Sequence, residues 1–114
     1  MILTAIAFFS LSAILGMLLL AFVLKGKHTP KAVVFTHGPL ALIGIILLVI
    51  YCVQNKPNPF ESIILFLIAA TSGVIMVAKD LSGKTIPKWL AVTHGLIAVG
   101  GFILLLMFQV NMNC

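Results

Sequence analysis

Four long stretches of almost unbroken apolar residues divide the chain, and short polar segments separate them. The stretches cover roughly residues 2–24, 32–53, 62–78 and 89–110. Each is close to the about 20 residues that a helix needs to cross the hydrocarbon core of a bilayer. None shows the strict alternation of polar and apolar positions that is typical of transmembrane strands. The pattern therefore predicts an all-α fold, a bundle of four transmembrane helices.

The composition agrees with a chain that lies within the bilayer. Of its 114 residues, 62% are hydrophobic and 8% are charged, whereas soluble domains carry about 25% charged residues. The first stretch lacks the basic leader and the cleavage pattern of a signal peptide, so we expect it to remain as the first helix. The segments between the stretches are too short for a soluble domain. We therefore treat residues 1–114 as one integral membrane domain.

The basic residues predict the orientation of the chain. The middle connection contains Lys56, and the other six lysines lie in or beside the first and third connections: Lys25, Lys27, Lys31, Lys79, Lys84 and Lys88. Lysines concentrate on the cytoplasmic side of membrane proteins. We thus expect both termini to be non-cytoplasmic, in the bacterial cytoplasmic (inner) membrane. The net charge of +5 is then a topology signal with affinity for anionic lipids, and it does not indicate nucleic-acid binding.

The second half of the chain repeats the first at an offset of fifty-seven residues. "PKAVVFTHGPLALIG" begins at Pro30, and "PKWLAVTHGLIAVGG" begins at Pro87. Further matches at this offset include Phe9 with Phe66, Gly16 with Gly73, and Gly26-Lys27 with Gly83-Lys84. Because each half contains two crossings, the halves have the same orientation and are related by an axis along the membrane normal. The sequence predicts two parallel helical hairpins, approximately residues 1–57 and 58–114.

Each half contains one histidine inside an apolar stretch, His37 and His94. Each lies seven residues after the proline that precedes its helix, which is about 10 Å along a helix axis. The two-fold axis would bring both rings face to face at one depth, in the cytoplasmic leaflet. Histidines within membranes usually point into the bundle and mark a function. We therefore take this pair as the candidate functional site.

The helix face below each histidine carries small residues. They follow at intervals of four and seven positions, on the same face: Ala41 and Gly44 after His37, and Ala98 and Gly101 after His94. Small residues let helix backbones approach closely. Between opposed histidines they would also leave space for a flat macrocycle. The pattern alone is compatible with both close helix packing and a cofactor site, and we take Ala41, Gly44, Ala98 and Gly101 as candidate cofactor-binding residues.

Two opposed imidazoles suit haem iron better than zinc. Zinc sites use four protein ligands, or three with a water molecule, and no cysteine or carboxylate lies near the two histidines within the membrane stretches. A six-coordinate haem iron takes one imidazole on each face, and helix-bundle cores commonly hold cofactors. Lys31 and Lys88 lie about two turns nearer the cytoplasm, where we expect the haem propionates to emerge.

These residues resemble the membrane b-type cytochromes, in particular the broad cytochrome b561-like group. The resemblance rests on the four-helix bundle and on the Thr-His-Gly motifs at residues 36–38 and 93–95. It implies haem b as cofactor and electron exchange with quinones or small reductants, as in a membrane oxidoreductase. Many members hold two haems through four histidines, whereas this chain has three histidines. Because of this departure from the family pattern, we expect one haem for each chain and not two.

Other interpretations remain open at this point. The histidine pair could form an interhelical polar contact without a cofactor, or a relay for protons or substrate. A small transporter has a similar size, but the first stretch lacks the carboxylate on which small multidrug exporters rely. The chain could also be an accessory or assembly subunit in a homodimer or a larger membrane complex. We expect His28 in a solvated loop, and pairing of Cys52 with Cys114 is left undecided.

Overall fold

Four helices make up nearly the whole computed structural model, which describes the backbone of residues 1–113 and the side chains of residues 1–111. Their bounds are α1 Ile2–Leu24, α2 Lys31–Gln54, α3 Phe60–Leu81 and α4 Lys88–Asn113. The described residues contain no strand. The all-α prediction is confirmed, and the predicted stretches match the helices closely. Helix α3 is longer than predicted at both ends, because polar residues beyond the apolar run continue the helix.

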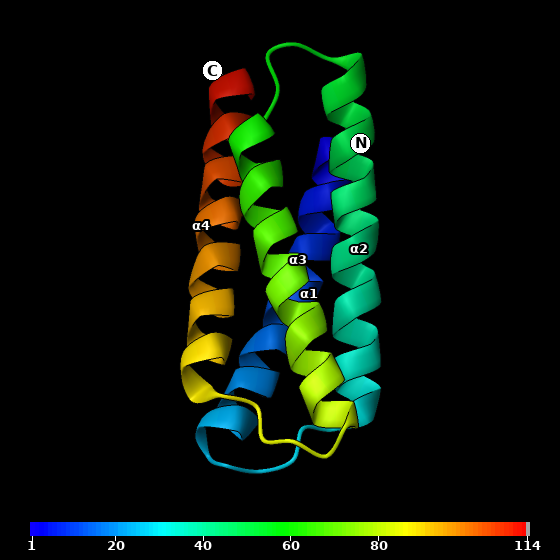
Figure 1. Cartoon of the computed structure of the whole chain (residues 1–114). Coiled ribbons are helices and arrows are strands. Elements are labelled where there is room, and N and C mark those ends of the chain that lie inside the picture. Colours follow the sequence, from blue (N-terminus) through cyan, green and yellow to red (C-terminus); the bar gives the residue numbers. More distant parts are fainter. Residues whose placement is uncertain (114) are drawn as a thin grey trace.

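The helices stand at the corners of a square bundle (Figure 1). Each helix contacts its two neighbours, and the backbones on the diagonals, α1 with α3 and α2 with α4, stay apart. Both ends of the chain lie at one end of the bundle with the α2–α3 loop, and the other two loops lie at the opposite end. The bundle measures 45 × 19 × 18 Å. All four helices are long and apolar enough to span a membrane.

Equivalent residues of the two halves meet on the bundle axis. The three aromatic pairs found among the described side chains all join positions fifty-seven apart: Phe9–Phe66, His37–His94 and Tyr51–Phe108. Leu48 and Leu105, which are also equivalent, are both fully buried. The hairpins α1–α2 and α3–α4 are therefore related by a pseudo-two-fold axis along the bundle. This arrangement confirms the predicted parallel repeat.

The turns that close the two hairpins also repeat. Helices α1 and α3 are each followed by a glycine with positive φ, Gly26 at 70° and Gly83 at 78°. At the first turn the N–H of Lys27 donates to the carbonyl of Phe22 at 2.9 Å, the bond that ends a helix through a left-handed residue. A side chain at such a φ would be strained. The chain then reverses to Pro30, which is the N-cap of α2.

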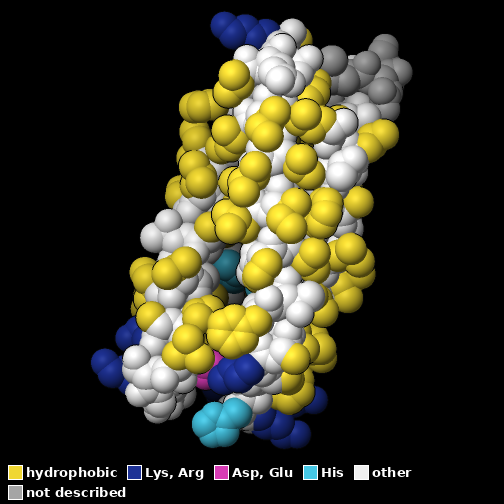
Figure 2. Space-filling view, turned by 90° about the vertical axis from the view of Figure 1, so that its right-hand side faces the viewer, with side chains coloured by type: hydrophobic (Ala, Val, Ile, Leu, Met, Phe, Trp, Pro, Cys, Tyr) yellow, Lys and Arg dark blue, Asp and Glu magenta, His cyan; other side chains and the backbone are white. Residues whose placement is uncertain are grey.

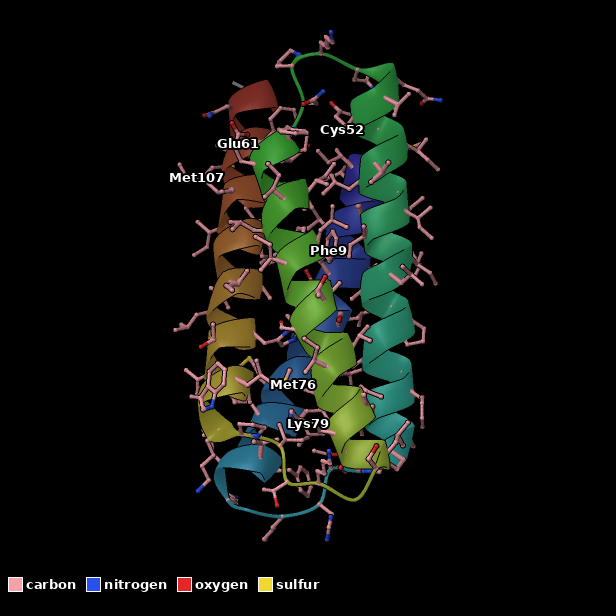
Figure 3. The ribbon with its side chains drawn as sticks, in the orientation of Figure 1. Phe9, Cys52, Glu61, Met76, Lys79 and Met107 are labelled. Carbon is pink, nitrogen blue, oxygen red and sulfur yellow. The ribbon has the colours of Figure 1, made fainter. Side chains whose placement is uncertain are left out.

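The face of the bundle drawn in Figure 2 is apolar along its length, with lysines at its two ends and most of them at one. Exposed large apolar side chains lie on all four helices. Figure 3 shows the contrast between the two environments, with Phe9 inside the bundle and Met107 pointing away from it. Phe9 is 5% exposed, whereas Met107 is 55% exposed. Soluble monomers rarely expose a continuous apolar surface of this size. The lipid bilayer is therefore the natural environment of this surface, and the protein is an integral membrane protein.

A polar cluster joins α2 to α3 at the lysine-rich end and breaks the two-fold symmetry. Asp80 accepts hydrogen bonds from the ammonium group of Lys31 and from the hydroxyl of Thr29, the latter at 2.9 Å. Thr29 is buried, and the Asp80 side chain is 11% exposed. The equivalents of Asp80 and Thr29 in the other half are Val23 and Ile86. The contact between the hairpins is thus polar at α2–α3 and apolar at α4–α1.

Ser62 is a second departure from the symmetry, and it gives a prediction for stability. Its hydroxyl oxygen is fully buried and has no hydrogen-bond partner among the described residues, and its equivalent is the fully buried Ala5. An unsatisfied buried hydroxyl costs about 1–3 kcal/mol. Ser62→Ala should therefore raise the free energy of unfolding in mixed micelles by this order. Ser10→Ala is the control without gain, because the Ser10 hydroxyl already donates to the carbonyl of Ile6. A less stable Ser62→Ala variant would show that the hydroxyl has a partner in the membrane.

Candidate functional site

His37 on α2 and His94 on α4 meet across the bundle axis, in the half nearer the lysine-rich loops. Their ring centroids are 6.3 Å apart, and the ring planes are inclined by 75°. Both side chains are partly buried. The backbones of α2 and α4 lie apart on a diagonal of the bundle. The two helices therefore approach each other here through these two side chains. The structure thus brings together the pair that the repeat places at equal depth.

The Nδ1 atom of each imidazole faces a backbone carbonyl of the neighbouring helix. His37 Nδ1 lies 2.7 Å from the carbonyl oxygen of Ser12 on α1. His94 Nδ1 lies 2.7 Å from the carbonyl oxygen of Ala69 on α3. A carbonyl oxygen can only accept a hydrogen bond. Each Nδ1 therefore carries a proton and donates, and the two acceptors are equivalent positions of the repeat.

A serine hydroxyl lies beside each of these bonds. Ser12 Oγ is 3.0 Å from Nδ1 of His37 and donates to the carbonyl of His37 at 3.1 Å. Ser72 Oγ is 2.9 Å from Nδ1 of His94 and donates to the carbonyl of Ala69 at 2.7 Å. The sequence did not single out these two serines as partners of the histidines, because they do not lie at the repeat offset.

The other ring nitrogen, Nε2, makes no hydrogen bond with any described residue in either histidine. With the proton on Nδ1, a neutral imidazole presents Nε2 as a lone pair. Neither Nε2 is sealed in the core, since Ser62 Oγ is the one fully buried unpartnered atom among the described side chains. Figure 2 shows a histidine side chain at the bottom of a recess between helices. The site offers two free lone pairs from opposite corners of the bundle.

Glycines on α1 and α3 make room for the two rings. A Cβ atom on Gly16 would lie 2.9 Å from Cε1 of His37, and a Cβ atom on Gly73 would lie 3.2 Å from Cε1 of His94. Both distances are shorter than ordinary van der Waals contact. By contrast, a Cβ atom on the glycine that follows either histidine would meet nothing within 4 Å. The rings are therefore seated by the neighbouring helices and not by the glycines of the Thr-His-Gly motifs.

The more distant small residues, Gly44 and Gly101, receive aromatic rings of the same chain. A Cβ atom on Gly44 would lie 3.0 Å from the ring of Phe9, and one on Gly101 would lie 3.2 Å from the ring of Phe66. These two rings stack with centroids 4.1 Å apart. The space that the sequence suggested for a macrocycle at these glycines is thus filled. We call Phe9 and Phe66 the phenyl stack. A ligand bound by the histidines must therefore lie between this stack and the lysine-rich end of the bundle.

The remaining predicted site residues lie on either side of the histidine layer. Ala41 and Ala98 are partly buried, one turn from the histidines toward the phenyl stack. Lys31 and Lys88 are exposed at the first residues of α2 and α4. Lys31 is paired with Asp80, whereas no ion pair of Lys88 is found among the described residues. Of these two lysines, Lys88 is therefore the one that remains open to an anionic group.

The other polar residues considered from the sequence lie away from the pair. His28 is exposed in the α1–α2 loop, as expected, and Cys52 is partly buried near the far end of α2. Cys114 lies outside the described residues, so its pairing with Cys52 stays open. No group of three or more histidine, cysteine or carboxylate side chains that could hold a metal ion is found in the described part of the chain. A metal ion at His37 and His94 would thus have two protein ligands.

Comparisons with known protein families, with characterised proteins and with solved structures give no match. The function must therefore be inferred from the geometry of the histidine site.

Proposed function

We propose that the protein binds one haem b between His37 and His94 and takes part in electron transfer within the membrane. One observation carries this proposal: both histidines donate Nδ1–H to a backbone carbonyl and keep Nε2 free inside the bundle. Histidines that ligate metals usually donate their second ring N–H in this way, which fixes the tautomer and the ring orientation. A simple interhelical histidine contact does not require a free Nε2 on both sides of the axis.

Haem iron suits this pair better than a metal ion held by side chains alone. It takes two axial ligands, whereas zinc needs a third or fourth protein ligand, and none is found among the described residues. The 6.3 Å between ring centroids leaves room for one metal atom bonded to both rings, since metal–imidazole bonds are about 2 Å long. When bound, haem supplies one-electron redox chemistry, with the protein setting its potential.

The residues around the histidines define how the chain would hold the macrocycle. The phenyl stack of Phe9 and Phe66 closes the site on the side away from the lysines. Ala41 and Ala98, which lie between this stack and the histidines, would line the space for the macrocycle. At the lysine-rich end, Lys88 is available to a propionate group. Lys31 is already neutralised by Asp80. The expected symmetric pair of lysines is thus replaced by a single one.

A lipid-soluble quinone is the proposed redox partner. Nearly all of the described chain lies in four membrane-spanning helices, so a carrier dissolved in the bilayer can approach the bundle along its whole apolar surface. A homodimer or a larger membrane complex would use the same surface. Addition of a quinol to the oxidised protein in liposomes should produce the reduced haem spectrum, and no change would exclude the quinone.

An absorption spectrum of the purified protein, expressed with ample haem, tests the proposal directly. We expect a sharp α band and a Soret band after reduction, with one haem for each chain. A colourless protein would reject the haem and favour an interhelical polar contact in an accessory subunit. Such contacts in membranes contribute only about 1 kcal/mol.

We further propose that both termini lie outside the cytoplasm of a bacterial cell, because six of the seven lysines lie at the opposite end of the bundle. A reporter fused after residue 114 should then be active on the outer side of the cytoplasmic membrane. A reporter inserted in the α3–α4 loop, residues 82–87, should be active in the cytoplasm. The reverse pattern would overturn this orientation.

A further inference from the structure

We infer that Ser12 and Ser72 are positioning residues that hold the two imidazoles in the tautomer that leaves Nε2 free for the haem iron. The identity of the ligand rests on the proposed function. The hydrogen bonds themselves belong to the chain alone, and they can be tested without haem.

Each serine completes a three-centre hydrogen bond around one Nδ1–H. A carbonyl oxygen accepts at 2.7 Å in both halves, and the hydroxyl oxygen lies at 3.0 Å for His37 and 2.9 Å for His94. The hydroxyl proton of Ser12 is directed to the carbonyl of His37, and that of Ser72 to the carbonyl of Ala69. Each hydroxyl therefore presents a lone pair to the ring, and both oxygens accept from the same N–H.

The alternative tautomer is disfavoured on both sides of the ring. With the proton on Nε2, the Nδ1 lone pair would face the lone pairs of the carbonyl oxygen, which cannot rotate away because it belongs to a helix. The Nε2–H would also have no acceptor among the described residues, whereas the Nδ1–H has two, a carbonyl oxygen and a serine hydroxyl oxygen. The carbonyl and the hydroxyl together favour the Nδ1–H tautomer, and the hydroxyl also restricts rotation of the ring.

The position of the serines in the repeat separates a hydrogen-bonding role from a packing role. The equivalent of Ser12 is Ala69, and the equivalent of Ser72 is Leu15. The carbonyl acceptors, in contrast, are at equivalent positions, 12 and 69. A small side chain is enough for packing at this point, as Ala69 shows. The two halves instead share a hydroxyl beside Nδ1, supplied from two different positions.

Ser10 shows how a serine in α1 behaves without this role. Its hydroxyl donates to the carbonyl of Ile6 at 2.8 Å, four residues earlier in the same helix. This local bond is a common use of serine within a helix. Ser10 lies two residues from Ser12, and it is therefore a matched control for removal of a hydroxyl from this part of the helix.

The first test uses the haem-free protein with nitrogen-labelled histidine, in which magnetic resonance distinguishes the two tautomers. Wild type should show Nδ1–H in both His37 and His94. Ser12→Ala should raise the Nε2–H population of His37 without affecting His94, and Ser72→Ala should do the reverse. Ser10→Ala should change neither. If Ser12→Ala and Ser72→Ala leave both tautomer populations unchanged, the positioning role is wrong, whether or not the protein binds haem.

The second test uses the haem-loaded protein. Loss of a hydrogen bond to a metal ligand typically lowers affinity about 10–100-fold, so the Kd for haem should rise by this order in Ser12→Ala and Ser72→Ala. Because the Nδ1 bond makes the ligand more basic, its weakening should raise the midpoint potential, by about 59 mV for each tenfold loss of preference for the ferric state. Ser12→Thr, which keeps the hydroxyl, should restore both values. Loss of stability with an unchanged potential would instead indicate a merely structural serine.

The two tests separate the two levels of the inference. A colourless wild-type protein in which the serine variants still shift the histidine tautomers would reject the haem and keep the positioning role. A coloured protein whose tautomers and potential ignore both serines would keep the haem and reject the positioning role.

Discussion

His37→Ala should lose the low-spin spectrum of a bis-histidine haem, and His94→Ala should lose it in the same way. Each change removes one of two iron ligands, which leaves either a high-spin five-coordinate haem or a protein without haem. The two variants should behave alike, because the pseudo-two-fold axis gives the rings equivalent surroundings. Absorption spectra of the purified variants, scaled to protein concentration, measure the effect. We expect at least a tenfold lower content of low-spin haem, on the scale by which even indirect changes to a metal ligand act.

His28→Ala is the control for this experiment, because His28 is exposed in a loop of the lysine-rich end. Its spectrum should equal that of wild type. The haem assignment would be wrong if both His37→Ala and His94→Ala retained the wild-type spectrum. If His28→Ala alone lost the spectrum, the ligand would lie in the loop, and the buried pair would be a structural contact.

Gly16→Ala should displace the ring of His37, and Gly73→Ala should displace the ring of His94 to a smaller extent. The added Cβ atoms would lie 2.9 Å and 3.2 Å from Cε1 of the rings, and overpacking of this kind costs about 1–3 kcal/mol. The higher helix propensity of alanine offsets about 1 kcal/mol of this cost. Haem binding should be affected more than stability, because the displaced imidazole ring moves away from the carbonyl oxygen that orients its Nδ1 atom. Haem content and the free energy of unfolding in mixed micelles measure the two consequences.

The motif glycines provide a matched control for the methyl group itself. Gly38→Ala and Gly95→Ala add the same atom next to the histidines in sequence, where nothing lies within 4 Å. Both variants should bind haem normally and should be at least as stable as wild type. Equal haem content in Gly16→Ala and Gly38→Ala would show that the space that Gly16 leaves for the ring of His37 is not required.

The sequence was sufficient for the fold and for the meeting of the histidines. The lengths of the apolar runs predict the four helices, and the fifty-seven-residue repeat predicts the axis on which His37 and His94 meet. These features depend on backbone periodicity and symmetry. Both can be read from one chain.

The surroundings of the histidines could not be predicted in the same way. In soluble helices the apolar face marks the side that points inward, but all faces of these helices are apolar, so the sequence does not reveal their rotation. For this reason Gly44 was expected to border a cofactor, whereas it receives the ring of Phe9. The bond from His37 to the carbonyl of Ser12 was also not predictable, because backbone acceptors leave no trace in residue identity. The matched glycines at 16 and 73 were visible in the repeat, but the sequence does not indicate that they make room for the histidine rings.

The phenyl stack also determines what the bundle does to the permeability of the membrane. Phe9 and Phe66 close the axis on the side of the histidine layer away from the lysines, and the fully buried Leu48 and Leu105 fill a further layer beyond them. A chain of water molecules cannot pass through these apolar layers, and an ion there would bear a large desolvation cost. The bundle axis therefore offers no continuous polar path from the lysine-rich side to the opposite side. A redox group held at the histidines, as proposed, would lie within the bilayer without opening a path that dissipates the ion gradient across it.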